Sequence, residues 1–463
     1  MSDVIAVVDV GATNTRVVLL DEALKEVASR KAATRHLPGP PYKAIDHEAL
    51  LDFVTRSLIE LDSLHPIDTI SISAFGATVA LLDEAHQLVL PIMDYLAEAP
   101  ARVDAEYARI APPFSEVFSN TSPGALTIGK QLYWIETEFP DYFEKVQHVL
   151  PFSAYIAHAL GGDAATEISN LGVFTHLINV KTGGWSSLVK QRGWERLFPP
   201  RRNAWDIIGR FSEPGTGRQL RGKGEILTGL HDSNANWLRY LAGQNGQFTL
   251  LSTGTFVIGF DSGADLSGLD PASDNFSFND IFGKPIGCGR FYGGYEFDKL
   301  LDGAPATGAS VEGLAAVISS GIFALPAFSD TGGPIAGRGN RGRIVGGSAE
   351  DPHLRASLAT LYYALMVDRM LDGLRSGSSI ILDGPAARNT LLMGLVGALR
   401  QGQTVFASEL SEGTTLGAGV LGQMKTTGQL PKLEIGLIAQ APLELSGLQA
   451  YRSRWIALIN EDN

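Results

Sequence analysis

The stretch Val4-Ile5-Ala6-Val7-Val8-Asp9-Val10-Gly11-Ala12-Thr13-Asn14-Thr15-Arg16 decides the fold of this chain. The continuous apolar and β-branched run before Asp9 is typical of a strand that is buried on both faces. The small polar residues from Gly11 to Thr15 predict a tight turn, and the apolar run 17–20 after Arg16 predicts a second strand. The opening therefore predicts a strand, a polar turn and a strand.

The same pattern returns in the second half of the chain. Residues 248–251 predict a strand, Ser252-Thr253-Gly254-Thr255 predicts a small polar turn, and residues 256–260 predict another strand. Helical spacing of apolar residues over 48–62 and strand alternation around Ile70 and Ile72 make the first half α/β. We therefore expect an α/β protein with a duplicated lobe, divided into residues 1–243 and residues 244–463.

Length and composition limit the classes of protein to consider. A chain of 463 residues with 44% hydrophobic and 19% charged residues fits two well-cored lobes rather than a disordered chain. The net charge of 37 − 50 = −13 argues against nucleic acid or an anionic membrane as the main partner. A single cysteine, Cys288, excludes an intrachain disulfide, and no apolar run is long enough for a signal or membrane segment. We expect an acidic cytoplasmic enzyme.

The two polar turns predict phosphate binding. Gly11 permits a tight path along which backbone N–H groups approach an anion, and Asp9 at the end of the first strand suits hydrated Mg²⁺. For one turn alone, an ordinary β-turn capped by an aspartate remains an alternative. A second such turn at Ser252–Thr255 predicts that the two lobes hold a nucleotide's phosphates from both sides of a cleft.

Two rival phosphate motifs fail. Residues 124–131 nearly match a P-loop, but Gln131 stands where the Ser or Thr that holds Mg²⁺ is needed, and no buried strand precedes Gly124. We interpret this segment as the start of a helix. The turn after Gly11 also lacks the further glycines of a dinucleotide-binding fingerprint.

Further candidate residues lie at the junction of the lobes and in the first lobe. Asp232 could accept a proton from a substrate hydroxyl, or it could simply cap the helix 233–241; His231 could be a packing residue or a hydrogen-bonding one. Asp94 and, more weakly, Thr78 are candidate contacts for the hydroxyls of a polyol, while a solvated loop acid remains the alternative for Asp94.

The last third of the chain carries two glycine-bearing segments. Asp383-Gly384-Pro385-Ala386 follows a predicted strand, and Asn389 could cap the next helix. Together with Thr415–Gly419, expected to be a second turn, this segment could support an adenine and its ribose, or both could be plain crossovers in a βαβ layer. We also predict helices over 130–138 and 142–160.

The order of these motifs resembles that of the FGGY carbohydrate kinases, which belong to the actin, Hsp70 and sugar-kinase superfamily. The resemblance spans Asp9 to about Gly422 and rests on the opening turn, the Gly229–Ala235 junction, the Ser252–Thr255 turn and the late glycine turn. Within the family, Gly76–Asp83 and His231-Asp232 look most like the rhamnulokinase and deoxy-ketose kinase branch.

The resemblance implies two ribonuclease-H-like lobes with ATP in the cleft between them and sugar on the first lobe. It implies a phosphotransferase in which Asp232 is the catalytic base and Asp9 and Asp232 lie near Mg²⁺. The implied sugar contacts are Thr78, Asp94, His231 and Asp232. The implied ATP contacts are Gly11, Thr13, Asn14, Thr15, Arg16, Thr253, Gly254, Thr255, Gly384, Pro385, Ala386 and Asn389. Its partner would be a small sugar, and a homodimer is left open.

The chain departs from the family pattern in two places. Pro385 removes an amide donor where the family has Gly-Gly-Gly or Gly-Gly-Ser, and Asp383 adds a charge, which puts the nucleotide preference in doubt. The segment after Pro91 offers Asp94-Tyr95 in place of the Trp, Asp and Arg of glycerol and xylulose kinases. We therefore expect a kinase for a ketose, such as the 6-deoxy ketoses rhamnulose and fuculose. The alternative is a sugar-binding or regulatory protein without turnover.

Overall fold

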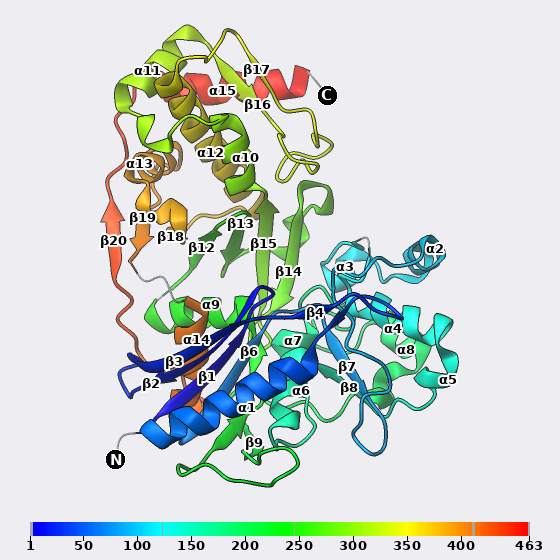
Figure 1. Ribbon diagram of the computed structural model, residues 1–463. Coiled ribbons are helices and arrows are strands. Elements are labelled where there is room, and N and C mark those ends of the chain that lie inside the picture. The colour runs from blue at the N-terminus through cyan, green and yellow to red at the C-terminus, as the bar shows by residue number, and fades with distance from the viewer. Residues whose placement is uncertain (1–2, 123, 245, 410–412, 462–463) are drawn as a thin grey trace. The chain divides into compact units, whose positions relative to one another are not determined.

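The computed structural model describes residues 3–122, 124–244, 246–409 and 413–461. Two compact units are present (Figure 1). Unit 1 comprises Met1–Gly243, Ser277–Pro285 and Glu412–Leu433, and unit 2 comprises Gln244–Phe276, Ile286–Ser411 and Glu434–Asn463. The first segment of unit 1 ends where the sequence predicts a change of lobe, and two later segments join it.

The centre of unit 1 is a seven-stranded sheet in the order β3-β2-β1-β6-β10-β9, with β11 also paired to β6. Strand β2 runs antiparallel to β1 and to β3, whereas β6 runs parallel to β1. The strands are β1 (Ile5–Val10), β2 (Asn14–Leu20), β3 (Glu26–Ala33), β6 (Thr69–Ala74), β9 (Ile207–Arg210), β10 (Glu225–Leu227) and β11 (Leu230–His231).

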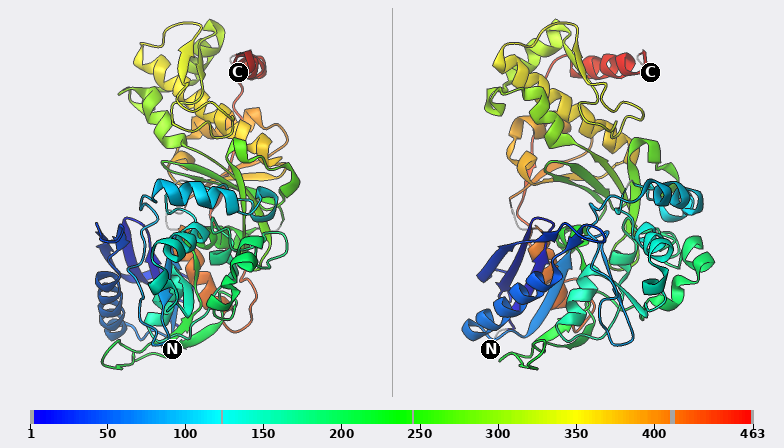
Figure 2. Two further views of the ribbon diagram at one scale, coloured as in Figure 1. Left: turned by 90° about the vertical axis from the view of Figure 1, so that its right-hand side faces the viewer. Right: turned by 45° about the vertical axis from the view of Figure 1, so that its right-hand side comes forward.

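Helices cover both faces of this sheet (Figures 1 and 2). Helix α1 begins after Asp46, whose side chain caps the amide of Ala49, and it buries one apolar face in the core. Helix α14 packs on β1, β6 and α9. A Cβ at Gly417 would lie 1.6 Å from the carbonyl oxygen of Ala235, so glycine permits the close approach of α14 to α9.

The other elements of unit 1 are short. Its helices are α1 (His47–Leu64), α2 (Ala101–Ile110), α3 (Phe114–Val117), α4 (Ile128–Glu138), α5 (Pro140–Phe143), α6 (Phe152–Ala159), α7 (Ile168–Leu171), α8 (Ser187–Arg192), η1 (Trp194–Leu197), α9 (Asp232–Gly243) and α14 (Gly413–Met424). Its small sheets pair β4 (His36–Leu37) with β5 (Ala44–Ile45) and β7 (Val79–Leu82) with β8 (His148–Pro151).

The sheet of unit 2 repeats the strand pattern of unit 1. Its order is β14-β15-β13-β12-β18-β19-β20. Strand β13 runs antiparallel to β12 and β15, and β18 runs parallel to β12, as β2 and β6 do around β1. The strands are β12 (Phe248–Thr253), β13 (Val257–Asp261), β14 (Asn275–Asn279), β15 (Pro285–Phe291), β18 (Ser379–Asp383), β19 (Val405–Ser408) and β20 (Leu437–Gln440). The predicted duplication is therefore confirmed.

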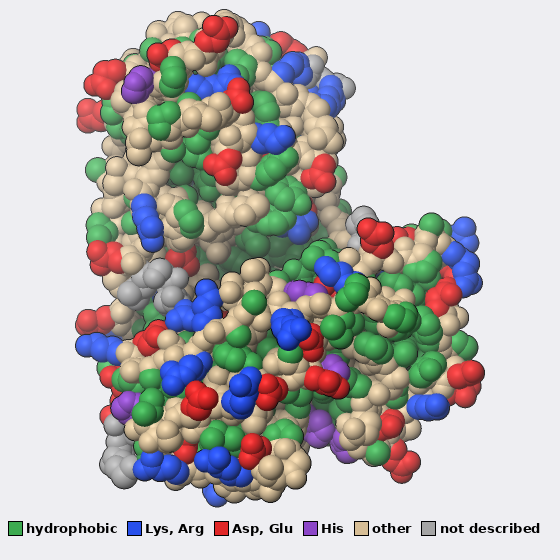
Figure 3. Space-filling view, viewed as in Figure 1, with side chains coloured by type: hydrophobic (Ala, Val, Ile, Leu, Met, Phe, Trp, Pro, Cys, Tyr) green, Lys and Arg blue, Asp and Glu red, His purple; other side chains and the backbone are tan. Residues whose placement is uncertain are grey.

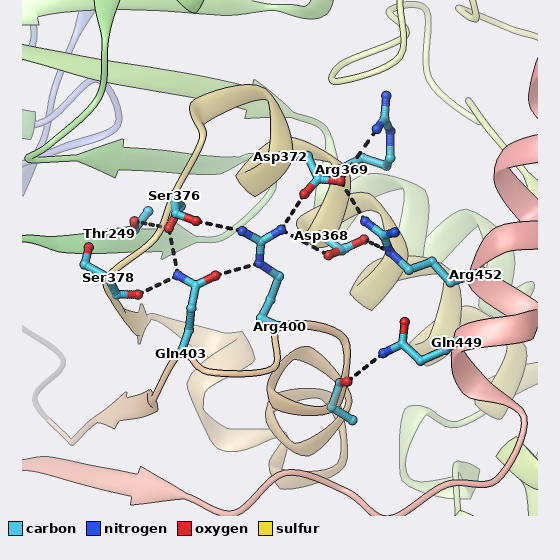
Figure 4. A network of polar contacts seen from close by, with 11 residues as sticks. Thr249, Asp368, Arg369, Asp372, Ser376, Ser378, Arg400, Gln403, Gln449 and Arg452 are labelled. Atoms are coloured by element: carbon cyan, nitrogen blue, oxygen red, sulfur yellow. Dashed lines mark hydrogen bonds and ion pairs between the residues drawn. The ribbon is translucent and has the colours of Figure 1, made fainter.

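Helix α12 is the longest helix of unit 2 and contacts α10, α11 and α13. An ion-pair network joins its Asp368 and Asp372 to Arg400 and to Arg452 of α15 (Figure 4). The helices are η2 (Leu266–Gly268), η3 (Pro271–Ser273), α10 (Gly293–Leu301), η4 (Ala306–Gly308), α11 (Val311–Ser320), α12 (Pro352–Leu374), η5 (Pro385–Arg388), α13 (Thr390–Leu399) and α15 (Leu448–Glu461), and β16 (Phe323–Leu325) pairs with β17 (Arg343–Val345).

Two expectations about local structure are wrong. Residues 142–160 do not form one helix, because β8 pairs with β7 and Pro151, which cannot lie inside a helix, directly precedes α6. Thr415–Gly419 lies inside helix α14 of unit 1 and is not a turn. The glycines of this segment therefore serve helix packing.

The face of unit 1 that carries α1 mixes charges of both signs (Figure 3). Exposed ion pairs there include Arg56 with Asp52 and Arg30 with Glu60. This face is thus an ordinary solvated surface. In the part of the chain that the structure describes, no helix combines the length and the apolar character needed to cross a membrane.

Candidate active site

The two acids predicted to do chemistry lie at one edge of the unit 1 sheet. Asp9 of β1 pairs with Ser73 of β6, and Leu230 of β11 pairs with the same Ser73 from the other side. Because neighbouring strands are about 4.8 Å apart, the backbones of Asp9 and Leu230 lie about 10 Å apart. Asp232 follows two residues later at the start of α9. The fold of unit 1 therefore brings both acids to the same sheet edge.

The Asp232 carboxylate is held by one of its two oxygens. Oδ1 accepts hydrogen bonds from the Ser233 amide at 2.6 Å and the Ser233 hydroxyl at 3.3 Å, and it lies 3.3 Å from Nε2 of His231. Among the described residues, no side chain or amide donates to Oδ2, and the side chain is 32% exposed. One oxygen is fixed and the other is available to accept a proton.

His231 orients Asp232. Its Nδ1 accepts a hydrogen bond from the Ser233 amide at 3.2 Å, so in the neutral ring the proton is on Nε2, which faces Asp232. Burial lowers the pKa of His231, which keeps the ring neutral at physiological pH. A Cβ at Gly76 would lie 2.5 Å from Nε2, so only glycine fits beside this ring.

A buried carboxyl group, that of Glu167, is linked by hydrogen bonds to the backbone of His231. Glu167 accepts hydrogen bonds from the hydroxyl of Ser169 at 2.6 Å, from its amide at 2.8 Å, and from the amide and side chain of Asn170. The Ser169 hydroxyl in turn accepts from the His231 amide at 3.4 Å. Burial raises the pKa of Glu167 to about 7, despite these donors. The sequence analysis gave Glu167 and Ser169 no role, because only the fold links them to His231.

Thr78 lies in the turn that contacts His231. Its hydroxyl is buried and, among the described residues, forms no hydrogen bond. The carbonyl of the preceding Ala77 accepts from Nε2 of Gln131 at 2.6 Å, and Ala77 itself has a left-handed φ of 53°. Gln131 therefore fixes this turn, and its neighbour Lys130 pairs with Asp104 at 2.6 Å, which confirms that this segment is not a P-loop.

Asp94 is fully buried, with 0% of its side chain exposed. Its Oδ2 lies 2.9 Å from Nδ1 of His36 and 3.0 Å from Nζ of Lys43, and its Oδ1 accepts from the Leu96 amide. His36 also lies 3.0 Å from the carbonyl of Ala12 in the first polar turn. His36 and Lys43 were missed because no local pattern links them to Asp94.

Tyr95 lies within the electrostatic influence of both Asp94 and Asp232. Burial raises the pKa of the Tyr95 phenol, and the charges of Asp94 and Asp232 raise it further. Its ring also packs edge-on against Phe75, directly before Gly76, at a centroid distance of 5.7 Å. Asp94, Tyr95 and Asp232 thus belong to one electrostatic neighbourhood in unit 1.

The first polar turn has an exposed tip and a buried base. The Gly11 amide closes it on the Asn14 carbonyl at 2.9 Å, and Thr13 and Asn14 are exposed. The Thr15 hydroxyl is buried and pairs with that of Thr34 at 3.0 Å. Arg16 pairs with Glu26 at 3.2 Å. The tip, and not Thr15, offers free polar groups.

Asp9 is the candidate metal ligand of this turn. Its Oδ2 accepts a hydrogen bond from the Thr415 hydroxyl at 3.2 Å, an oxygen-rich setting that suits Mg²⁺. Across residues 3–122, 124–244, 246–409 and 413–461, no three His, Cys, Asp or Glu side chains converge as a metal site. Mg²⁺ keeps most of its waters and needs only one or two carboxylates, so Asp9 stays a candidate ligand.

Unit 2 contains a pocket of about 900 Å³. It combines the second polar turn with the late glycine turn and adds aromatic side chains that sequence reasoning did not assign. The lining residues are Thr253, Gly254, Thr255, Gly294, Tyr295, Phe297, Asp298, Ala306, Thr307, Ala309, Tyr363, Pro385, Ala386, Arg388, Asn389, Thr390, Leu391 and Leu392. The structure thus brings two of the predicted nucleotide-binding segments into one cavity.

Gly384 makes the junction of these two turns possible. Its φ is +86°, and a Cβ there would lie 2.2 Å from the Thr253 carbonyl oxygen. The Thr253 hydroxyl donates to the Asp383 carbonyl at 2.5 Å and accepts from the Ala386 amide at 3.1 Å. Asp383 is 8% exposed, and its carboxylate accepts a hydrogen bond from the Gly384 amide. Asn389 caps α13, as its position predicts.

Comparison with known proteins shows two family matches that together cover most of the chain. Residues 4–238 match the N-terminal domain of the FGGY family of carbohydrate kinases, and residues 245–430 match the C-terminal domain of the carbohydrate kinases FGGY. The L-fuculokinase of Haemophilus influenzae is 25% identical over 266 residues, which are 54% of this chain and 56% of that protein. The chain thus spans little more than half the length of the curated relatives it matches.

Solved structures share the fold over nearly the full length. A carbohydrate kinase from Novosphingobium aromaticivorans is 27% identical, with a TM-score of 0.89 over 98% of this chain and 100% of that one. A ligand-bound xylulose kinase from Lactobacillus acidophilus has a TM-score of 0.79 at 17% identity, over 99% and 97% of the two chains. The second likeness shows the fold alone.

Proposed function

Because this chain belongs to the FGGY family of carbohydrate kinases, we propose that it is an ATP-dependent kinase that phosphorylates a hydroxyl of a ketose. The observation that carries this proposal is the asymmetric Asp232 carboxylate. Oδ1 is held by Ser233 and His231, and Oδ2 accepts nothing from the described residues. A general base needs such a fixed group with one oxygen within reach of the proton it removes.

In the proposed reaction, Asp232 accepts the proton of the sugar hydroxyl. The hydroxyl oxygen forms a bond to the γ-phosphorus of ATP, and the bond from that phosphorus to the β,γ-bridging oxygen breaks, so that ADP leaves with the electron pair. The chain's own contribution is positioning and the neutralisation of charge, because phosphoryl transfer needs little covalent help. His231 acts here as a positioning residue through its Nε2–H.

We assign the sugar to unit 1. Thr78 has a buried hydroxyl without a partner, and Tyr95 lies in the field of Asp232. The Asp94 carboxylate is itself buried. In this proposal it therefore positions His36 and Lys43, whose side chains are 26% and 40% exposed, to contact the sugar. We propose that the site is specific for the hydroxyl pattern of a 6-deoxy ketose, such as fuculose or rhamnulose. Relatives named L-fuculokinase support this proposal.

We assign the nucleotide to the pocket of unit 2, and the tip of the first polar turn in unit 1 stays a predicted phosphate contact. Tyr295, Phe297 and Tyr363 offer aromatic faces for a base, and Thr253 and Gly254 offer small polar groups for phosphates. Pro385 removes one amide donor but lies in the same lining. The Asp383 carboxylate accepts a hydrogen bond from the Gly384 amide at 2.8 Å.

Mg²⁺ fits the carboxylates at the sheet edge. Asp9, with Asp232 through water, would hold the ion. When bound, it neutralises charge on the transferred phosphoryl group. The use of ATP is also our reason for proposing a cytoplasmic location.

A substrate screen tests this proposal. ADP release from MgATP would be measured over L-fuculose, L-rhamnulose, D-xylulose, D-fructose and glycerol, and the product would be identified by ³¹P NMR. We expect a phosphate ester with a 6-deoxy ketose and little turnover with glycerol. Saturable sugar binding without ADP release for every compound would contradict the proposal and favour a sugar-binding protein without turnover.

A further inference from the structure

Unit 1 contains a second pocket, of about 730 Å³, whose lining residues have no part in the proposed reaction. Its walls are the segment Arg201–Asp206 before β9, the turn at Thr182 and Gly183, and the turn Ile281–Gly283 between β14 and β15. We call it the arginine pocket.

The charge of this pocket is carried by two arginines. Arg201 donates from Nη1 to the Gly183 carbonyl at 2.7 Å, and its guanidinium lies 5.5 Å from the centre of the Trp185 ring. These contacts fix the planar guanidinium group of Arg201 and leave its other N–H donors available to a ligand. In the part of the chain that the structure describes, Arg202 has no carboxylate within ion-pair distance. Arg201 and Arg202 both line the pocket, and two arginines that contact one ligand favour a doubly charged anion such as a phosphate ester.

Arg201 is exposed and lines the pocket, so an anionic ligand can reach its guanidinium. Desolvation lowers the pKa of Arg201, and the acid that acts on it most is Glu167. Burial raises the pKa of that acid to about 7, so Glu167 neutralises Arg201 only in part. An anion in the pocket would supply the missing counter-charge.

The remaining walls suit a sugar. Trp205 and Phe282 pack with ring centroids 5.4 Å apart, and Phe282 is 45% exposed. Aromatic faces of this kind pack against the C–H face of a sugar ring. Asp206, held by the Asn203 amide at 3.0 Å, adds a carboxylate that can accept hydrogen bonds from hydroxyls. The pocket thus joins anion donors to a surface for a polyol.

A chain of contacts leads from this pocket toward the proposed base. Arg201 acts electrostatically on Glu167, and Glu167 accepts from the Ser169 hydroxyl at 2.6 Å. That hydroxyl accepts from the amide of His231, whose ring faces Asp232. A change of charge beside Arg201 therefore acts on Glu167 through space, and hydrogen bonds link Glu167 to the positioning residue.

We propose that the arginine pocket is a second binding site of this protein, that its ligand is a phosphorylated sugar, and that occupancy changes the rate of turnover. The effect on turnover rests on the proposed function, whereas binding itself does not. The site is separate from the one that transfers phosphate, so the ligand is an effector and not the acceptor.

Calorimetry on the full chain, without nucleotide, tests binding with fructose 1-phosphate as the probe. We expect saturable binding to the wild type and a loss of about tenfold in affinity in Arg202→Gln, because one charge-assisted contact is removed. The matched control is Arg218→Gln, an exposed arginine of unit 1 outside the pocket. It should bind like the wild type, and equal melting temperatures would show that all three proteins are folded.

Several results would overturn the proposal. Wild-type affinity in Arg202→Gln would place the probe elsewhere, including at the sugar site. If unphosphorylated fructose bound as tightly as fructose 1-phosphate, the arginines would not bind the phosphate. If inorganic phosphate bound as tightly, Trp205 and Phe282 would not bind the sugar. None of these binding measurements depends on ADP release. A negative binding result therefore does not affect the proposed kinase function, and a lack of turnover does not affect the binding result.

Discussion

Asp232 and His231 show how a short local sequence can build the carboxylate that we propose as the general base. The helix α9 begins at Asp232, so the Ser233 amide is free of helical partners and donates to the carboxylate. The same amide donates to Nδ1 of His231 and thereby fixes the tautomer. The result is a carboxylate with one anchored and one available oxygen.

Gly76 is the residue on which the His231 ring depends. In Gly76→Ala the added Cβ, 2.5 Å from Nε2, forces the ring away from Asp232. We expect kcat for the identified sugar to fall by about 10- to 100-fold, because the base loses its orientation. Steady-state kinetics of ADP release would measure this.

The control for this change is Gly377→Ala, where a Cβ meets nothing within 4 Å. It should keep the wild-type kcat. A Gly76→Ala protein that turns over like the wild type would show that the position of His231 does not matter.

Sequence reasoning found Asp232, Asp9 and the polar turns because each belongs to a short pattern of neighbouring residues. It could not find His36 as the partner of Asp94, because 58 residues separate them and only the fold brings them together. It also could not show that the Asp94 carboxylate is buried. Partners of this kind depend on tertiary contacts, which leave no local signal.

At the scale of elements, strands and helices with strong periodicity were predicted well. The runs before Asp9 and around Ile380 form β1 and β18, since buried parallel strands are continuous apolar segments. The failures were segments where two structures compete. Thr415–Gly419 has the composition of a turn, but tight packing of α14 on α9 requires small residues inside a helix.

Helix α15 tests how a terminal element is held on unit 2. Arg452 pairs with Asp368 at 2.5 Å and with Asp372 at 2.7 Å, and Asp368 is 1% exposed (Figure 4). Arg452→Ala removes a partner from the buried Asp368 and from the partly exposed Asp372, so we expect a loss of about 3 kcal/mol in the free energy of unfolding. Chemical denaturation would measure it.

Arg454 on the same helix is the matched comparison. It pairs with Glu461 at 2.8 Å, but both side chains are more than half exposed. Arg454→Ala should therefore cost less than about 1 kcal/mol. Equal losses in the two variants would mean that the network does not hold α15.

At the scale of the whole molecule, the repeated strand pattern explains why two polar turns occur in one chain. In each unit the turn follows the strand that lies between an antiparallel and a parallel neighbour. The same backbone geometry therefore presents small polar residues twice. The sequence predicted this duplication because the buried strands that flank each turn are continuous apolar runs.

The stability of the whole chain should depend on pH through Glu167. Its folded-state pKa is raised from 4.5 to about 7 by burial, so folding favours the protonated form. This contribution is fully present below pH 4.5 and is lost as the pH rises through 7. The stability lost between acid and alkaline pH amounts to about 3 kcal/mol.

Glu167→Gln removes this titration. As the pH rises from 5 to 8, the stability of the variant should increase relative to that of the wild type. This holds whichever protein is the more stable at either pH. The melting temperatures of both proteins across this range would measure the difference. A constant difference between the two proteins would contradict the assignment of the raised pKa to Glu167.

The measurement that tests the central claim most directly is the comparison of wild type with Asp232→Asn, for sugar binding and for ADP release with the same sugar. The amide keeps the size of the side chain but cannot accept the proton. We predict that kcat falls by about 10² to 10⁴ while the sugar still binds. Unchanged ADP release in Asp232→Asn would contradict the role of Asp232 as the base.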